Sequence, residues 1–153
     1  MSPAGAGPAF SAPPRFNHVA VSVPADALDA DGRAAICEFY GDVLGFEEHP
    51  SMTEDRRRLV LGAHTVEQFV YVVAQDEPMV AHHQDHYGLS VASRDDFDEV
   101  VRRAEAWRDR LPEEVTVDGP TSEDHAGVLR LHSVYVTYRL PLTVEVQHFE
   151  WLG

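Results

Sequence analysis

Hydrophobic and polar positions follow two different periods along the chain, and the periods occur in the same order in both halves. Residues 17–23 and 85–91 each begin with two polar residues, have a small residue at the fourth position and end in an aliphatic residue, Ser and Val, which indicates a β-strand at the start of each half. Each stretch is followed by apolar residues that recur every three to four positions, as in an amphipathic helix. The pattern predicts one helix that ends at Gly45 and a second helix between Ser93 and Leu111.

Strand-like runs follow both expected helices. They cover 46–49, 57–62 and 66–74 in the first half and 113–118, 128–138 and 143–151 in the second half. Each half is thus predicted as strand, helix, strand, strand, strand, and each last strand opens with Thr-Val-Glu. A unit of this size with a half-exposed sheet would be marginally stable alone, so the two modules, residues 15–80 and 81–153, are expected to pack together.

The composition excludes several classes of protein. Hydrophobic residues make up 44% of the 153 residues, and no apolar run approaches the ~20 residues that a membrane span needs. Twelve basic against 26 acidic residues give a formal charge of −14, which disfavours nucleic-acid binding. All twelve are arginine, so Schiff-base chemistry and a P-loop are excluded, and the single Cys37 excludes an internal disulfide.

Two segments depart from the average composition. Residues 1–14 are rich in Ala, Pro, Gly and Ser, which predicts a flexible tail. This segment lacks the basic and apolar regions of a secretory signal, so a cytoplasmic location is expected. Residues 56–58 are three consecutive arginines, either aimed at a substrate carboxylate or forming a solvated strand start.

The two opening strands form an internal repeat with a histidine at equivalent positions. Residues 17–23 read Asn-His-Val-Ala-Val-Ser-Val, and residues 85–91 read Asp-His-Tyr-Gly-Leu-Ser-Val. The histidines are His18 and His86. Since side chains alternate along a strand, both histidines can point to one side of their sheets.

This repeat and the junction at residues 39–47, Phe-Tyr-Gly-Asp-Val-Leu-Gly-Phe-Glu, resemble the vicinal oxygen chelate superfamily. The superfamily includes glyoxalase I, bleomycin-resistance proteins, fosfomycin-resistance enzymes and extradiol dioxygenases. The opening strand with His18 and the closing strand with Glu145 also match the positions of the corresponding strands in this superfamily. The resemblance covers about residues 15–151. It implies an α+β fold: two tandem βαβββ modules form a curled, cup-shaped mixed sheet with the helices outside and the site on the concave face.

The resemblance further implies a divalent metal held by His18, His86 and Glu145. Two imidazoles and one carboxylate form a facial triad that leaves positions open for water, substrate or oxygen. Iron, zinc, manganese and nickel all suit such a ligand set. The alternative is that both histidines are partly buried strand residues satisfied by hydrogen bonds.

Two further sets of residues are candidates for catalysis. Glu67 repeats Glu145 within the Thr-Val-Glu tripeptide, and glyoxalase-like members place a ligand or a catalytic base at this position. His132 and Tyr138 precede Glu145 as a His and a Tyr do in extradiol dioxygenases, where both residues handle protons; equal parity predicts that they face the same side. The alternatives are an exposed glutamate at a strand start and ordinary strand residues.

The resemblance therefore implies a divalent-metal-dependent enzyme of the dioxygenase, lyase or isomerase type. Its substrate would be a small molecule that chelates the metal through adjacent oxygens. The alternative function is metal-free binding of a drug or metabolite, as in the bleomycin-resistance proteins. Retention of all three ligands favours the enzyme. A homodimer is expected because small curled sheets leave edge strands that need covering, the alternative being a monomer.

Overall fold

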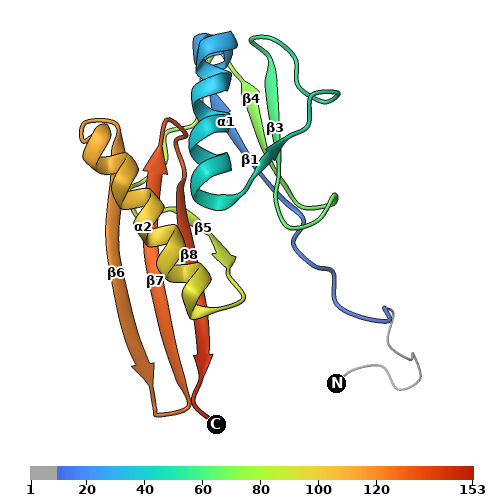
Figure 1. Ribbon diagram of the computed structural model, residues 1–153. Helices are drawn as coiled ribbons and strands as arrows, with labels where there is room; N and C mark the ends of the chain where they lie inside the picture. The colour runs from blue at the N-terminus through green and yellow to red at the C-terminus, as the bar shows by residue number, and fades with distance from the viewer. Residues whose placement is uncertain (1–9) are drawn as a thin grey trace.

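The computed structural model describes residues 10–153 and has the element order that the sequence pattern predicts (Figure 1). The first module contains β1 (His18–Val23), a short 3₁₀ helix η1 (Ala25–Leu28), α1 (Ala30–Leu44), β2 (Glu47–Glu48), β3 (Arg58–Gly62) and β4 (Phe69–Ala74). The second module contains β5 (His86–Ser90), α2 (Arg94–Arg110), β6 (Val115–His125), β7 (Leu129–Tyr138) and β8 (Thr143–Trp151). The predicted α+β fold with two βαβββ modules is confirmed, whereas η1 was not predicted.

The ends of both helices follow from local side-chain chemistry. The Asp29 carboxylate accepts a hydrogen bond from the backbone N–H of Gly32 at 2.8 Å and caps the start of α1. Gly45 ends α1 with a φ of 71°, a left-handed conformation that glycine adopts without a steric cost. Ser93 caps α2 by accepting from the N–H of Asp96 at 3.0 Å. The predicted helix end at Gly45 and helix start at Ser93 are both confirmed.

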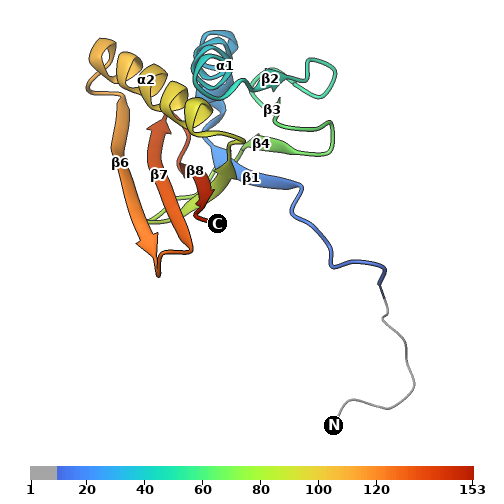
Figure 2. The same cartoon turned by 60° about the horizontal axis from the view of Figure 1, so that its bottom comes forward.

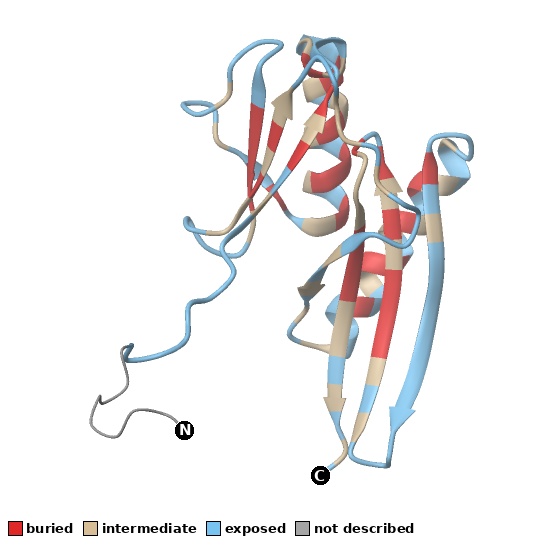
Figure 3. Ribbon diagram, turned by 180° about the vertical axis from the view of Figure 1, so that it is seen from behind, coloured by how far each residue is buried: buried red, intermediate tan, exposed pale blue. Residues whose placement is uncertain are grey.

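Each module builds its own four-stranded mixed sheet. The strand order is β1-β4-β3-β2 in the first sheet and β5-β8-β7-β6 in the second, with β1 parallel to β4 and β5 parallel to β8. The strands β1 and β5 are therefore edge strands. Figure 2 shows both helices on the same side of the molecule, above the two sheets. We call the sheet face opposite the helices the free face; Figure 3 views the molecule from this side.

The two modules pack through their helices. Phe39 on α1 meets Trp107 on α2 edge-on, with ring centroids 5.3 Å apart. The indole Nε1 of Trp107 donates to Asp42 Oδ2 on α1 at 2.8 Å. Tyr40 donates its hydroxyl to the carbonyl of Tyr138 on β7 at 2.8 Å. These contacts join both modules into one hydrophobic core.

Two strand boundaries differ from the predicted ones by three residues or more. β4 begins at Phe69 rather than Val66, because Gln68 donates its backbone N–H to the carbonyl of Thr65 and closes a turn at 3.0 Å. β6 continues to His125, beyond the predicted end at residue 118. Within residues 10–153 no helix is long and apolar enough to cross a membrane. Residues 1–9 of the predicted flexible tail lie outside the described residues, and residues 10–17 contain neither helix nor strand.

Candidate functional site

A cluster of polar side chains lies on the free face of the second sheet. Glu145 of β8 pairs in register with Tyr135 of β7, whose hydroxyl donates to Glu145 Oε1 at 2.7 Å. Gln147 donates its Nε2 to the same oxygen at 3.0 Å. On the edge strand β5, the Nε2 atom of His86 lies 3.1 Å from Glu145 Oε2. These four residues, His86, Tyr135, Glu145 and Gln147, are called the Glu145 cluster below.

Glu145 is the most buried member of the Glu145 cluster. Only 8% of its surface is exposed, so its carboxylate depends on the three neighbouring polar groups to replace water. The hydrogen bond to this carboxylate raises the pKa of Tyr135 to about 12, because ionisation would place two negative charges side by side. Tyr135 therefore stays protonated at neutral pH and presents a hydrogen-bond donor in the cluster.

The hydrogen bonds of His86 fix which of its nitrogens carries a proton. Its Nδ1 lies 2.8 Å from the carbonyl oxygen of Gln84, an atom that only accepts hydrogen bonds. Nδ1 must then carry the proton, and Nε2 turns towards the Glu145 carboxylate. A lone pair facing a carboxylate at 3.1 Å is repulsive unless a second proton or a cation lies there. Metal-bound histidines in proteins usually donate their other N–H in this way.

The separation of these two groups suits a shared metal ion. Two ligands of one ion, at about 2.0–2.2 Å and at angles between a right angle and a tetrahedral one, lie about 2.8–3.6 Å apart. The distance of 3.1 Å between His86 Nε2 and Glu145 Oε2 falls in this range. The pair thus fits two of the three ligands that the sequence predicts.

The third predicted ligand, His18, lies on the edge strand of the other sheet. Its Nδ1 lies 2.7 Å from Asn17 Oδ1, and its ring stacks on Phe69 with centroids 4.9 Å apart. Among residues 10–153, no three His, Cys, Asp or Glu side chains approach closely enough to hold one ion. A single chain therefore brings His86 and Glu145 together but leaves His18 apart, and metal binding by the three residues stays a prediction.

Glu67 does not occupy the place that the Thr-Val-Glu repeat predicts. It lies in the turn before β4, where its exposed carboxylate pairs with Arg15. In the first sheet Ala20 pairs with Tyr71, as Gly88 pairs with Glu145 in the second sheet. Since β4 begins four residues after Thr65, the equivalent of Glu145 is Tyr71 rather than Glu67.

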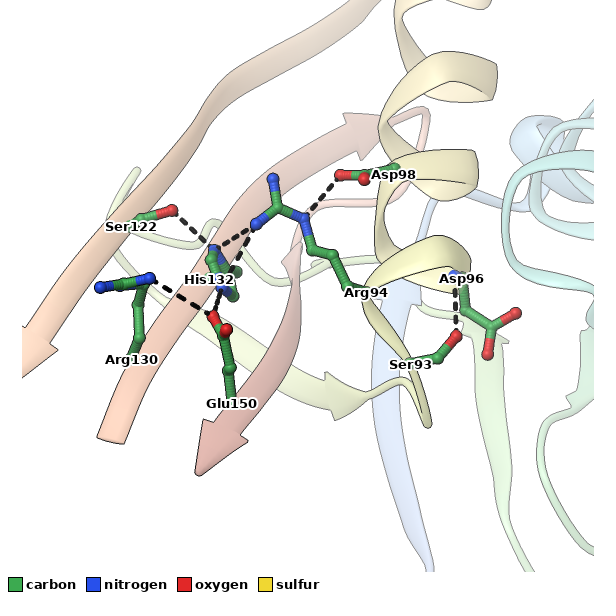
Figure 4. Close-up of polar contacts among 8 residues, drawn as sticks. All are labelled: Ser93, Arg94, Asp96, Asp98, Ser122, Arg130, His132 and Glu150. Carbon is green, nitrogen blue, oxygen red and sulfur yellow. Dashed lines mark hydrogen bonds and ion pairs between the residues drawn. The ribbon is translucent and has the colours of Figure 1, made fainter. Parts of the chain in front are cut away.

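His132 lies on the helix side of the second sheet, opposite the Glu145 cluster. It is 2% exposed, and its ring nitrogens contact Ser122 Oγ at 2.6 Å and Glu150 Oε2 at 2.8 Å (Figure 4). The Arg94 guanidinium on α2 lies 3.2 Å from His132 Nδ1. The hydrogen bond from His132 lowers the pKa of Glu150 below its usual range. These contacts tie α2 to the three long strands.

Tyr138 shares this side of the sheet, as its parity with His132 predicts. Its ring packs on Phe39 with centroids 4.5 Å apart and is 3% exposed. The structure thus does not bring Tyr138 or His132 together with Glu145. Sequence reasoning missed two members of the cluster, Tyr135 and Gln147. The register of the β7–β8 hairpin is the signal that could have found Tyr135. Residues of odd number on β7 face the same side as Glu145.

Comparison with known proteins supports the fold and leaves the activity open. Neither a protein-family model nor a curated protein matches the sequence. A lactoylglutathione lyase structure from Agrobacterium tumefaciens is 19% identical with a TM-score of 0.57, over 89% of this chain and 94% of that one. A glyoxalase/bleomycin resistance protein from Albidiferax ferrireducens is 15% identical with a TM-score of 0.58, over 87% and 98%.

A third solved structure extends this group. An integron cassette protein from the mobile metagenome of the Halifax Harbour sewage outfall is 19% identical with a TM-score of 0.59, over 88% of this chain and 97% of that one. Identities this low establish a common fold and nothing finer. The chain has the glyoxalase-type fold, which is the fold that the resemblance of residues 39–47 implies.

Proposed function

We propose that this protein is a divalent-metal-dependent enzyme that acts on a small molecule with adjacent metal-chelating oxygens. The observation that carries the proposal is the pairing of His86 with Glu145. The imidazole is proton-bearing at Nδ1, and its Nε2 turns towards a carboxylate at 3.1 Å. A cation between the two groups, in place of a second proton on Nε2, would make this contact attractive and use both atoms as ligands.

The proposed site is completed by a second copy of the chain. His18 begins the edge strand β1, and His86 begins the edge strand β5, so both lie where another strand can pair. If β1 of one copy lies beside β5 of another, His18 reaches the His86–Glu145 pair across the contact. A two-fold symmetric homodimer would then contain two such sites. The edge strands that need covering and the separation of His18 within one chain both support this arrangement.

Each residue of the proposed site has a separate role. His86, Glu145 and His18 of the second copy would hold the ion, and a bound divalent ion polarises the substrate oxygens that chelate it. Tyr135, which stays protonated, donates a hydrogen bond to Glu145 or to a substrate oxygen that displaces this contact. Gln147 holds the carboxylate from the other side at 3.0 Å.

The open-faced ligand triad without Glu67 suits this geometry better than a glyoxalase-like site with four ligands. Glu67 points to Arg15, and its structural substitute, Tyr71, is no carboxylate base. A site of two histidines and one carboxylate leaves coordination positions for a chelating substrate and for oxygen. Oxygen uptake during turnover would indicate a dioxygenase, and turnover without uptake would indicate a lyase or isomerase.

The test of the proposed function is metal binding by the purified protein. Stripped protein is titrated anaerobically with iron(II) and separately with zinc, and metal bound per chain is measured. The wild type is expected to bind one ion per chain, and His86→Ala and Glu145→Ala are expected to lose it. His125→Ala is the matched control, since His125 is an exposed histidine that contacts only Glu123 among the described residues. Failure of the wild type to bind either metal would favour the metal-free binding protein.

A further inference from the structure

The first sheet carries a polar pocket at the far end of its free face. The pocket has a volume of about 660 Å³ and lies between the end of β4 and the loop that precedes β3. Tyr71 and Val73 of β4 line it together with the arginine run of residues 56–58, which covers the end of the loop and the start of β3, and with the acidic Glu54 and Asp76. The arginine run, which the sequence singled out, is thus gathered around one cavity.

Few of the guanidinium donors in this pocket are occupied. Arg57 reaches Glu54 at 3.1 Å, and Arg56 reaches Asp26 at 3.3 Å. Arg58 has one charged neighbour among the described residues, Glu54 at 3.8 Å, which is too long for a hydrogen bond. Glu54 is therefore shared by two guanidiniums, Asp26 pairs with the third, and Asp76 adds a further carboxylate to the lining. Three guanidiniums carry more N–H donors than these few contacts use, so several N–H groups remain available to a ligand.

The loop that carries the arginines contains one residue with a strained backbone conformation. Arg56 has a φ of 55°, a left-handed conformation that is unfavourable for residues with a Cβ atom. Its N–H donates to the carbonyl of Leu28 at 2.9 Å, and the loop is closed by a bridge between Glu54 and Arg58. Backbone strain of this kind often marks a functional segment, here the segment that carries the arginines.

We infer that this pocket binds an oxyanion, either a carboxylate or a phosphate group, through Arg58 and its two arginine neighbours. Guanidinium groups bind both anions with paired, charge-assisted hydrogen bonds. The surrounding protein, with a formal charge of −14, repels anions, so a local arginine cluster is needed to hold one. Tyr71 adds a polar aromatic side chain to the lining.

The position of the pocket links the anion to the substrate of the proposed enzyme. His18 pairs with Phe69 at the start of β4, and Arg58 pairs with Val73 four residues further along. At ~3.3 Å per residue this separation is about 13 Å along the strand. A substrate with chelating oxygens at one end and an acidic group several bonds away would span both sites. This last step rests on the proposed function, whereas anion binding itself does not.

Replacement of Glu54 tests whether the arginines bind the anion, because the Glu54 carboxylate competes with a bound anion for the guanidiniums of Arg57 and Arg58. Removal of a guanidinium should weaken anion binding, and removal of the Glu54 charge should strengthen it. Arg102 offers a matched control, since it is an exposed arginine of α2 that pairs with Glu99 outside this pocket. A site that responds to total charge alone would not distinguish Arg58 from Arg102.

The experiment titrates the full chain, without metal, with sodium phosphate and separately with sodium acetate at constant ionic strength. Backbone amide signals of residues 54–58 and 71–76 are followed by NMR. Saturable shifts with phosphate, acetate or both support the inference and identify the acidic group. We expect about tenfold weaker binding for Arg58→Gln, tighter binding for Glu54→Gln and unchanged binding for Arg102→Gln.

Two results would overturn the inference: no saturable shift with either anion, or equal affinities of wild type and Arg58→Gln. The half-exposed Arg58 side chain makes no hydrogen bond among the described residues, so its replacement should leave the fold intact, and the amide spectrum reports this directly. His86→Ala should bind the anion like the wild type. A wild-type protein that binds the anion but neither iron(II) nor zinc would therefore reject the proposed function alone.

Discussion

Tyr71 occupies in the first module the position that Glu145 occupies in the second. In the first module His18 pairs with Phe69, and Tyr71 follows two residues later on the same strand. In the second module His86 pairs with Thr143, and Glu145 follows two residues later. The two modules are thus alike in topology but unlike in chemistry. The second module supplies a histidine and a carboxylate, and the first supplies a histidine and a phenol.

Replacement of Tyr135 should lower turnover, whereas replacement of Tyr138 should leave it nearly unchanged. Tyr135→Phe removes the donor to Glu145, so turnover should fall by roughly 10-fold or more while the fold is retained. Tyr138→Phe keeps the ring that packs on Phe39 and loses only a contact from Arg139 at 3.1 Å. Turnover of Tyr138→Phe should be close to wild type. Steady-state kinetics with an identified substrate would check both, and a severe effect of Tyr138→Phe would contradict this geometry.

Glu67→Gln should be nearly silent. The carboxylate pairs with Arg15 at the surface, where an ion pair contributes about 0–1 kcal/mol. Neither metal affinity nor thermal stability should change appreciably. Calorimetric metal titration and thermal denaturation would check this outcome. A loss of metal binding would restore Glu67 as a ligand and would require a different course of the chain before β4.

Ionisation of Tyr135 should lower the stability of the folded protein at alkaline pH. Its pKa is raised to about 12 in the folded protein, compared with about 10 for a free tyrosine. The folded state thus binds the Tyr135 proton more tightly than the unfolded state does. The stabilisation that this proton provides is complete below pH ~10 and is lost as the pH rises towards 12. Denaturant unfolding at several alkaline pH values should show a shallower decline for Tyr135→Phe than for the wild type. Equal declines would contradict the hydrogen bond to Glu145.

Asp42 should be important for the packing of the two modules. Its carboxylate accepts from the Trp107 indole at 2.8 Å, and its loss leaves that largely buried donor unpaired. Asp42→Ala should destabilise the protein by about 1–3 kcal/mol in denaturant unfolding. Asp109→Ala is the control, because Asp109 is exposed and contacts only Arg108 at 3.6 Å among the described residues. Equal stabilities of the two variants would rule out this contact as a tie between modules.

The sequence predicts the fold well because each element has a local signal. The apolar stripe around Phe39, the cap at Ser93 and the glycine at residue 45 all act over a few residues. The βαβββ order follows from these signals and from the repeat of the two opening strands. The start of β4 could not be predicted from local similarity, because the two Thr-Val-Glu tripeptides are followed by different turns.

The site was less accessible to sequence analysis. His86 and Glu145 come together because β5 pairs with β8, and this pairing brings residues far apart in sequence into contact. The choice between Tyr138 and Tyr135 depends on the register of the β7–β8 hairpin, which a one-residue shift reverses. Whether His18 reaches Glu145 depends on an edge-to-edge contact that no local pattern specifies.

The most direct test of the central claim, a metal site shared between two copies, is complementation between two defective variants. His18→Ala and His86→Ala are expected to bind no metal as separate proteins. When they are unfolded, mixed in equal amounts and refolded, half of the dimers are mixed, and each mixed dimer contains one site with both histidines. Anaerobic metal titration should then recover roughly a quarter of the wild-type sites. Refolded mixed dimers that bind no metal would contradict the shared site.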